Sequence, residues 1–520
     1  MLASKVYESY VLQWALGQVK LKNNQYGGMK GSSACHLLVS LWQDILIDLE
    51  DCRAATLLTA IDYAKAFNRM RFQECLLSFA RHGASDEVIQ LVSTFLSDRY
   101  MSVRVGNSWS EARPVHGGVP QGSILGVLLF NITTDNLEDQ EDATGYRQSA
   151  GQDQQSSDDH ITSESDEEMP ATPGVIHSTP AEAEAECFEP GITPMRRAPD
   201  FVFLPSARNV RRALATRMDV ALLRDVTLPP EPSPVTSAIW RHRPTSVKKY
   251  IDDSISDTKI NMETVEQDHL NCRDKHAVDA QNIFRRTIRN AESIGMKANC
   301  DKTTLLCISD AISFTANAHI FSSKDRRLES GNELKLLGFH FNRRPNCSAQ
   351  VESIKRSVRG RYWLLIHMKQ HHFSEEELVK AYTTIIRPIM EYCSPAFHSL
   401  LTDAQDETLE RLQATSLRYI YGYGPSYARM REMSGLQSLR ARRIAACDKF
   451  VASCLTQDRY AGWFPENKPA RKSRHTLLYK EEYARCDRLK NSPIFFFRRR
   501  LNGKPGKEYG QRYRHYRDSN

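Results

Sequence analysis

The spacing of apolar and polar residues in the first 135 positions predicts alternating helices and strands. Helical spacing runs through the segments CHLLVSLWQDILIDLED (35–51), RFQECLLSFARHG (71–83) and DEVIQLVSTFLSDR (86–99). The segment ATLLTAIDYAKAF (55–67) begins as a strand and turns helical, and YMSVRVGNSWSEARPV (100–115) alternates like a hairpin around Gly106-Asn107.

A second ordered region begins near residue 246. It contains a short hairpin at YIDDS (250–254), a helix near Ala277–Ile294, and two strands, TTLLCIS (303–309) and LKLLGFHFN (334–342). Helical spacing then dominates from Val351 to about Leu455. The ordered parts therefore predict a mixed α and β protein.

The region between these two parts is acidic and lacks apolar periodicity. From Glu138 to Glu189 there are fifteen Asp and Glu against one Arg. Such a composition cannot bury enough apolar surface to offset the entropy of ordering the chain, so residues 138–245 are predicted to form a largely disordered insert. Within it, Val210–Val226 has the spacing of a short amphipathic helix. An unspliced intron in the gene is the other origin of such a segment.

The C-terminal segment has the opposite charge. Residues 468–520 contain sixteen Lys and Arg against five Asp and Glu, interleaved with aromatic residues as in SPIFFFRRRLNGKPGKEYGQRYRHYRDSN. Cations neutralise phosphates and aromatic rings stack on bases, so this tail suits nucleic acid. A disordered, solubilising tail is the alternative.

Composition narrows the class of protein. The 520 residues include 12 cysteines without a CxxC pair or a Cys/His cluster at zinc spacing, which favours reduced thiols over a metal knuckle or a disulfide framework. No apolar run approaches the ~20 residues needed to cross a bilayer, and the N-terminus is unlike a signal peptide. We therefore expect a soluble, intracellular protein of the nucleus or cytoplasm without membrane contact. Its oligomeric state is left open.

Three carboxylates are the main candidates for chemistry. Asp62 ends the apolar strand TLLTAI, and Asp252 and Asp253 are adjacent in the YIDD turn. Two acids in a hairpin turn beside a third at the end of a neighbouring strand form an oxygen cage of the kind that Mg²⁺ prefers. Because like charges at this density are costly without a cation, the pattern predicts a metal site. Taken alone, YIDD is also typical of a solvated turn.

A glycine-rich segment is a second candidate site. GGVPQGSILGVLLFNI (117–132) joins a glycine turn, a Pro-Gln-Gly sequence and an apolar helix. Gly118 and Gly122 allow a ligand to approach the backbone closely, and Gln121 is suited to contact a nucleotide or a template base. A loop that caps a core helix would explain the glycines but not the Pro-Gln-Gly-Ser order.

The order of these motifs resembles the reverse transcriptases of non-LTR retrotransposons and their group II intron-type relatives. QYGGMKGSS resembles the fingers motif, AIDYAKAFNRM the first palm motif, and GGVPQGSILGVLLF the Pro-Gln-Gly motif. YIDD matches the catalytic hairpin, GMKANCDKTTLLCIS the next palm motif, and LKLLGFHF the primer-grip hairpin. The helical segment after Ile385 is similar to their thumb and connector, so the resemblance extends over about Gln25–Lys449 apart from the insert.

The resemblance implies an RNA-directed DNA polymerase with an α+β right-hand polymerase fold, in which an antiparallel palm sheet carries the YIDD hairpin. The predicted layout is partial fingers and the first part of the palm at 1–137, the insert at 138–245, the second part of the palm with the YIDD and primer-grip hairpins at 246–345, a helical thumb or connector at 346–460, and a basic tail at 461–520.

The resemblance also implies roles for single residues. Asp62 and Asp252 bridge two Mg²⁺ ions, with Mn²⁺ as the alternative metal, while Asp253 supports them and Lys302 protonates the pyrophosphate leaving group. Phe67 occupies the position of the aromatic gate that rejects a ribose 2′-hydroxyl. The implied partners are an RNA template, a DNA primer and dNTPs. The residues expected to contact nucleotide or template are Lys30, Tyr63, Phe67, Pro120, Gln121 and Gly122.

Departures from the family pattern leave two other functions open. About two dozen residues precede the fingers motif, an upstream endonuclease is not seen, Lys30 stands near the position of an Arg, and Asn68 replaces a common Asp. One alternative is an inactive retroelement relic that binds RNA through the basic tail, and the other is a maturase-like RNA-binding role. The presence of all three acids together with Gln121 and Lys302 favours the enzyme.

Overall fold

The computed structural model describes residues 2–50, 54–120, 122–137, 246–250, 253–261, 275–299, 301–309, 319–321, 327–467 and 477–503. The predicted insert and its helix at Val210–Val226 lie outside these ranges, as do Gln121 and Asp252. Residues 98–115 belong to a separate unit from the other described residues, and the two units are described one at a time.

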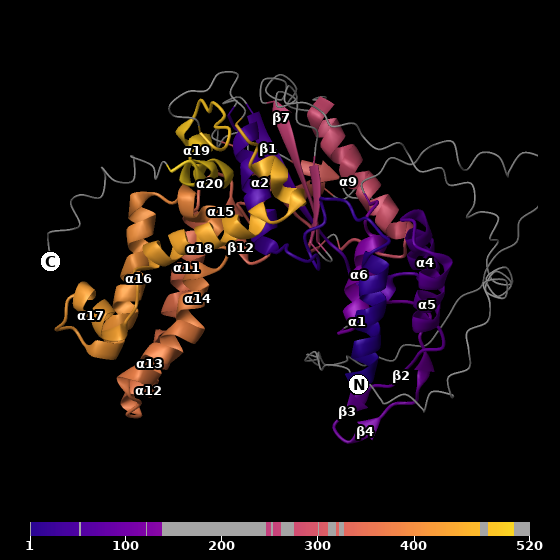
Figure 1. The fold of residues 1–520 in the computed structure, drawn as a ribbon, viewed down its shortest axis with the longest axis horizontal. Coiled ribbons are helices and arrows are strands. Elements are labelled where there is room, and N and C mark those ends of the chain that lie inside the picture. The colour runs from indigo at the N-terminus through magenta and orange to yellow at the C-terminus, as the bar shows by residue number, and fades with distance from the viewer. Residues whose placement is uncertain are drawn as a thin grey trace, which may run out of the picture. The chain divides into compact units, whose positions relative to one another are not determined.

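The main sheet of the larger unit has four antiparallel strands in the order β6-β7-β1-β8 (Figure 1). The strands are β6 (Ser246–Tyr250), β7 (Asp253–Asn261), β1 (Ala54–Asp62) and β8 (Thr304–Ile308). β1 is therefore an inner strand, as its nearly continuous apolar sequence indicates. The predicted strands at TLLTAI and TTLLCIS and the predicted YIDDS hairpin are confirmed.

Both faces of this sheet are buried. Side chains of a strand point alternately to opposite faces, and Leu57 and Leu305 join one hydrophobic core while Leu58 and Leu306 join the other. At β1 and β8 the sheet is thus a layer between two hydrophobic cores, which is why β1 does not alternate between apolar and polar residues.

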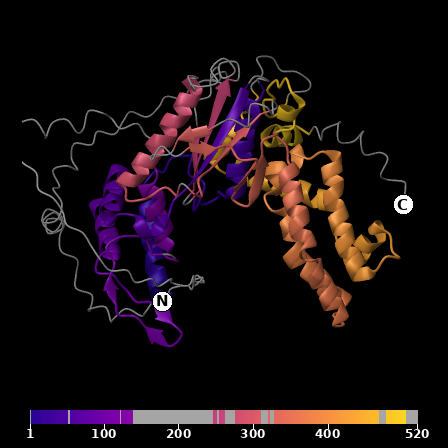
Figure 2. The ribbon, with the colours of Figure 1, turned by 180° about the vertical axis from the view of Figure 1, so that it is seen from behind.

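The core that contains Leu57 is formed with helices of the N-terminal part and with one later helix. They are α1 (Leu2–Leu16), α3 (Ala66–Arg69), α4 (Phe72–Arg81), α5 (Asp86–Leu96), α6 (Ile124–Thr133) and α9 (Lys275–Ser293). In α9, Phe284, Ile288 and Ala291 are buried at helical spacing, and this helix lies alongside β7 in both ribbon views (Figures 1 and 2).

The spacing of apolar residues predicted five of these elements but not α1. Among the apolar side chains of α1 that are described, those of residues 5–16, Val11 and Ala15 are fully buried, whereas Val6, Tyr10 and other large ones are exposed. A helix whose apolar residues do not gather on one face carries little periodic signal.

The opposite core is built on α2 (Ala34–Asp48), a helix with eleven buried residues. Its Trp42 ring lies 5.1 Å from the ring of Phe341 and 6.1 Å from that of Phe339. Those phenylalanines belong to a hairpin of β11 (Glu333–Leu336) and β12 (Phe339–Asn342). A further two-stranded ladder consists of β9 (His319–Phe321) and β10 (Arg327–Glu329).

The apolar run LKLLGFHFN is therefore two strands, and the single strand predicted from its spacing is wrong. The chain reverses at Leu337 and Gly338, which have φ values of 49° and 79°. Two successive residues with positive φ are the requirement of the tight turns that match the twist of a hairpin. A hairpin at this place is what the resemblance implied.

Helices follow without interruption by strands between residues 348 and 463. They are α11 (Ser348–Arg359), α12 (Tyr362–Gln370), α13 (Glu375–Ala381), a π-helix (Tyr382–Ile386), α14 (Arg387–Glu391), α15 (Ser394–Phe397), a 3₁₀ turn (His398–Leu400), α16 (Asp403–Tyr421), α17 (Tyr427–Ser434), α18 (Leu439–Leu455) and a second 3₁₀ segment (Asp458–Trp463). The predicted helical region is confirmed, and α13 and α16 each begin with a capping box.

The described part of the C-terminal segment is folded. It contains α19 (Asp487–Lys490) and α20 (Pro493–Leu501), and α20 packs against α2. Phe496 and Phe497 are buried, and the guanidinium of Arg498 donates to the Trp463 carbonyl at 2.7 Å. Phe496 and Phe497 therefore pack in the core and are not accessible for stacking on bases, whereas residues 504–520 of the predicted basic tail lie outside the described residues.

Residues 98–115 form two small ladders. β2 (Tyr100–Met101) pairs with β5 (Arg113–Pro114), and β3 (Arg104–Val105) pairs with β4 (Ser108–Trp109). Gly106 and Asn107 connect β3 to β4, which confirms the predicted hairpin. Among all described residues, none of the helices combines the length and hydropathy needed to span a bilayer.

Candidate active site

The register of the main sheet brings two predicted carboxylate positions together. Asp62, the last residue of β1, is the direct antiparallel partner of Asp253, the first residue of β7. Tyr250 is also paired with Asp253, so the turn between β6 and β7 consists of residues 251 and 252. Opposed residues of an antiparallel pair have Cα atoms about 4.5–5.5 Å apart. Asp253 is therefore close to Asp62, and Asp252 is the residue that precedes Asp253 in the sequence.

A loop that follows α9 is hydrogen-bonded to the same end of β1. The Asn299 N–H donates to the Asp62 carbonyl at 2.7 Å, and the Ala64 N–H donates to the Lys297 carbonyl at 2.9 Å. Lys302 is exposed in the turn that follows, with its N–H bonded to the Asn299 carbonyl at 3.1 Å. These backbone bonds tie the segment that carries Lys302 to the strand end that carries Asp62.

The loop before α6 packs on the turn after β1. The Val119 N–H donates to the Phe67 carbonyl at 2.6 Å, and the Gly118 N–H donates to the Met70 carbonyl at 2.8 Å. The Phe67 ring is half-buried and stacks on Phe130 of α6, with 4.5 Å between ring centroids. The Pro-Gln-Gly segment and the strand end with Asp62 are thus parts of one local structure.

Gly118 is required by this packing, and we expect its replacement by Ala to destabilise the protein. Its φ is +85°, and a Cβ atom would meet backbone atoms of Asn68 at 2.8–3.0 Å. Gly435 is the matched control because its φ is +64° but a Cβ atom there meets nothing within 4 Å. Both Ala variants should lose about 1 kcal/mol from backbone strain, and Gly118→Ala about 1–3 kcal/mol more because backbone must move. Urea unfolding measures the difference, and equal losses would contradict it.

The start of α6 is capped from two sides. Ser123 accepts a hydrogen bond from the Gly126 N–H at 3.0 Å, and Glu8 of α1 accepts from the Ser123 hydroxyl and the Ile124 N–H, both at 2.8 Å. A carboxylate is favourable at the positive end of a helix dipole. Glu8 thus fixes the start of α6, directly after Gly122. The sequence pattern did not predict this role, because it did not predict α1.

The other predicted binding residues are more dispersed. Tyr63 is 5% exposed and belongs to a core, so its ring packs among apolar residues. Lys30 is exposed in the turn before α2, Pro120 is half-buried and Gly122 is exposed with a φ of +80°. Gln121 lies outside the described residues, as do Asp252 and the side chain of Asp253.

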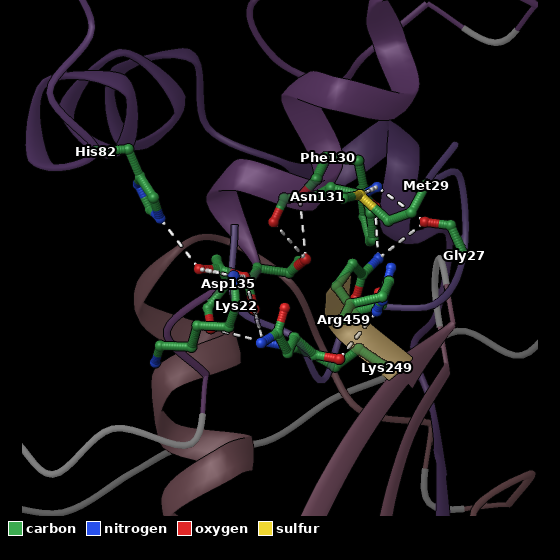
Figure 3. A network of polar contacts seen from close by, with 12 residues as sticks. Lys22, Gly27, Met29, His82, Phe130, Asn131, Asp135, Lys249 and Arg459 are labelled. Atoms are coloured by element: carbon green, nitrogen blue, oxygen red, sulfur yellow. Dashed lines mark hydrogen bonds and ion pairs between the residues drawn. The ribbon is translucent and has the colours of Figure 1, made fainter. Parts of the chain in front are cut away.

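A buried polar network joins β6 to the C-terminal end of α6 and was missed from the sequence (Figure 3). Lys249 of β6 and His82 both contact Asp135, which follows α6. An anion just after the C-terminus of a helix opposes the helix dipole unless a cation is near it. The position of Asp135 after an apolar helix therefore indicates a nearby cation, but apolar spacing alone does not reveal it.

The same network fixes the loop before α2. Gln25 donates from Nε2 to Oδ1 of Asn131 at 2.6 Å, and Asn131 donates to the Gly27 carbonyl at 2.9 Å. Arg459 donates to the Gln25 carbonyl at 2.8 Å and lies over the ring of Tyr26. The segment resembling the fingers motif is thus held by α6 on one side and by the chain after α18 on the other.

The donor chemistry near Asp62 fits a hard divalent cation. Among the side chains that the structure describes, no three His, Cys, Asp or Glu residues are grouped to hold a metal ion, and two of the three predicted ligands are not in that set. The backbone register sets two carboxylate-bearing positions, Asp62 and Asp253, opposite each other at one end of the sheet. Carboxylate oxygens are the protein ligands that Mg²⁺ prefers.

Comparison with known proteins gives a consistent picture. Residues 1–145 match the family described as reverse transcriptase (RNA-dependent DNA polymerase). The chain is 33% identical over 120 residues to a probable RNA-directed DNA polymerase from transposon BS of Drosophila melanogaster, which covers 22% of this chain and 13% of that protein. It is 34% identical over 85 residues to the RNA-directed DNA polymerase from mobile element jockey of Drosophila funebris, covering 16% of this chain and 9% of that protein.

The chain thus spans less than a seventh of the length of these curated relatives in the matched regions. The family match contains Asp62, Phe67 and the Pro-Gln-Gly segment and ends before the YIDD turn. Residues 1–145 are therefore similar to reverse transcriptases over the part that carries Asp62 and the Pro-Gln-Gly segment, and the resemblance to non-LTR retrotransposon reverse transcriptases that the motifs predicted is confirmed.

Proposed function

We propose that this chain is an RNA-directed DNA polymerase that extends a primer on an RNA template. The observation that carries the proposal is the register of β1 against β7, which sets Asp62 opposite Asp253 and next to the turn that contains Asp252. The names of the two relatives, both RNA-directed DNA polymerases, support the same activity.

In the proposed site Asp62, Asp252 and Asp253 hold two Mg²⁺ ions, with Mn²⁺ as a substitute. When bound, such a pair of ions activates the primer 3′-hydroxyl and stabilises the leaving oxygen. Lys302 is an exposed cation on the segment hydrogen-bonded to Asp62 and is proposed to donate a proton to the pyrophosphate.

The aromatic gate is proposed at Phe67. Its ring stacks on Phe130, and its carbonyl accepts the Val119 N–H, so the side chain and its backbone are both held. A ring held in this way excludes a 2′-hydroxyl by shape, because it cannot move aside without breaking the stack. Gln121 and Gly122 come shortly after Val119 in the sequence and are proposed to contact the incoming nucleotide or the template base. Lys30 and Pro120 complete the proposed contacts. Tyr63, which was expected to be a contact residue, is buried in a core and is proposed to support the site from there.

The right-hand polymerase architecture is part of the proposal. The four-stranded sheet corresponds to the palm, the N-terminal helices to partial fingers, and α11 to α18 to the thumb and connector. The support is that each motif resembling the family falls on the type of element expected for it: the YIDD turn on a hairpin, the Pro-Gln-Gly segment before a helix, and the primer-grip segment on a second hairpin.

A groove on the helical part is suited to the backbone of the primer–template duplex. It has a volume of about 660 Å³ and lies between α11 and α16. Its lining residues combine three cations with hydroxyl and aromatic groups: Lys355, Arg359, Arg411, Tyr362, Thr408, Thr415 and Tyr419. Guanidinium and hydroxyl donors are the groups that bind phosphate oxygens without reading sequence.

Replacing Arg359 and Arg411 together by Ala is expected to weaken binding of an RNA–DNA duplex and to reduce the slope of log K against log salt by about 2. The control removes the same charge at Arg429 and Lys380, which are exposed cations outside the groove. Binding titrations at several salt concentrations measure both quantities. If the two double variants weaken binding equally, net charge and not the groove determines affinity.

The proposed activity is tested with the full chain on poly(rA) primed with oligo(dT), in Mg²⁺ and dTTP. We expect processive addition of nucleotides. Retention of RNA without any synthesis would favour the inactive RNA-binding relic over the enzyme.

A further inference from the structure

The strand that leads into the YIDD turn carries two consecutive buried lysines. Lys248 is 4% exposed and Lys249 is 2% exposed, and both belong to β6, which ends at Tyr250. Isolated ammonium groups are very costly to bury, so such residues are retained only where partners compensate them.

Lys249 is bound to the C-terminal end of the helix that follows the Pro-Gln-Gly segment. Its Nζ donates to the carbonyls of Thr134 at 3.1 Å and Asp135 at 2.5 Å, and it lies 3.8 Å from Oδ1 of Asp135 (Figure 3). Carbonyls at a helix C-terminus carry the negative end of the dipole and lack partners within the helix, so an ammonium group there is favourable.

Asp135 is held from its other side. Its carboxylate accepts the Lys22 N–H at 3.2 Å and contacts Nε2 of His82 at 3.1 Å, while Nδ1 of His82 contacts the Ser78 carbonyl at 2.7 Å. Both ring contacts of His82 are acceptors, so the doubly protonated ring satisfies both. Burial lowers the pKa of His82, but the hydrogen bonds to Asp135 and Ser78 outweigh it and raise the pKa overall.

Lys248 is anchored on the other face of the strand. Successive residues of a strand point to opposite faces, and Lys248 forms a short ion pair with Asp44 of α2, whereas Lys249 points to α6. The backbone of Lys249 is bonded as well: its N–H donates to the Asn24 carbonyl at 3.0 Å, and its carbonyl accepts the Tyr26 N–H at 2.8 Å. β6 is therefore clamped between α2, α6 and the loop before α2.

We propose that Lys248 and Lys249 are positioning residues that hold β6, and through its pairing with β7 hold Asp253 opposite Asp62. In this proposal they contact neither substrate nor metal. They act by fixing β6, in which Lys249 lies three residues before Asp252 in the sequence. The inference rests on the proposed function, because a metal-binding turn is what the clamp would orient. The clamp also joins Asp135 to Lys249, two described residues that are separated in the sequence by the 108-residue segment 138–245.

The test compares Lys249→Met, which keeps the length of the side chain and removes its charge, with the unaltered full chain. We expect faster amide hydrogen exchange in peptides that cover 246–261, and weaker binding of Mn²⁺ alone, followed by its electron paramagnetic resonance signal. In primer extension we expect kcat to fall by about 10- to 100-fold with KM for dNTP changed less than about twofold, because misplacement of catalytic groups by about 1 Å costs about 100-fold.

Two further variants keep the result interpretable. Asp135→Asn retains the shape of the side chain and the carbonyl partners of Lys249, so it should fold even if Lys249→Met does not. We expect it to change amide exchange, Mn²⁺ binding and kcat in the same direction as Lys249→Met but by less. Arg429→Met breaks an exposed ion pair with Glu432 on α17 and should leave exchange, Mn²⁺ binding and kcat unchanged.

The outcomes separate this inference from the proposed function. If the unaltered chain extends primers and both Lys249→Met and Asp135→Asn match it in exchange, Mn²⁺ binding and kcat, the positioning role is wrong while the polymerase stands. If the unaltered chain neither extends primers nor binds Mn²⁺ at the hairpin, yet exchange rises in Lys249→Met, the polymerase is wrong while the clamp stands.

Discussion

Replacing Asp62 with Asn is expected to lower the rate of primer extension by about a thousandfold or more. The side chain loses the negative charge that the proposed metal site requires, while its size and its place at the end of β1 are kept. Asp62 is only half-buried, and its backbone bonds to the Asn299 N–H and to β7 do not involve the side chain. The variant should therefore unfold at nearly the same temperature as the unaltered chain.

Asp98→Asn is the matched control for this prediction. Asp98 is exposed and has a φ of 51°, a conformation that Asn adopts readily, so the same chemical change should affect neither stability nor extension. Full activity of Asp62→Asn under Mg²⁺ would remove Asp62 from the proposed site, whatever the other carboxylates do.

Replacing Trp42 with Ala is expected to lower the free energy of unfolding by about 3–5 kcal/mol. The Trp42 side chain is 1% exposed and packs on Phe339 and Phe341, so it joins α2 to the β11–β12 hairpin. Its removal leaves a cavity between a helix and a hairpin that are both fixed by other contacts, and neither can close it easily. Urea unfolding followed by circular dichroism measures the change.

Trp42→Phe provides the comparison. Nε1 of Trp42 is buried and has no hydrogen-bond partner in the described structure, so Phe removes an unsatisfied polar group while keeping most of the apolar contact. We expect it to cost less than about 1.5 kcal/mol. An equally large loss in both variants would mean that the indole nitrogen, and not the filled volume, is what the site requires.

The elements and their neighbours could largely be predicted from local spacing. The strand that ends at Asp62, the YIDDS hairpin and the helix after Gly122 are all short-range patterns, and each is present. The pairing of β1 with β7 was suggested only by the requirement that acids share a metal. The apolar run 334–342 did not distinguish the hairpin at Leu337-Gly338 from a single strand. Leu is not a typical turn residue, so the positive φ at Leu337 could not be predicted from the sequence.

The residues that hold the site could not be predicted in the same way. Lys249, Asp135 and His82 are far apart in the sequence, and each one alone is typical of a solvated surface. Their burial follows from how β6, α6 and α4 pack, which periodicity does not encode. Glu8 is a similar case, since its partner is the N-terminus of a helix more than a hundred residues away.

The most direct test of the central claim is primer extension on an RNA template with Mg²⁺ and dNTPs, comparing the purified full chain with a variant that carries both Asp252→Ala and Asp253→Ala. The account predicts extension by the unaltered chain and its loss in the double variant, with RNA affinity retained in both. No extension by a folded, RNA-binding unaltered chain would contradict it, and so would extension that persists without the two carboxylates.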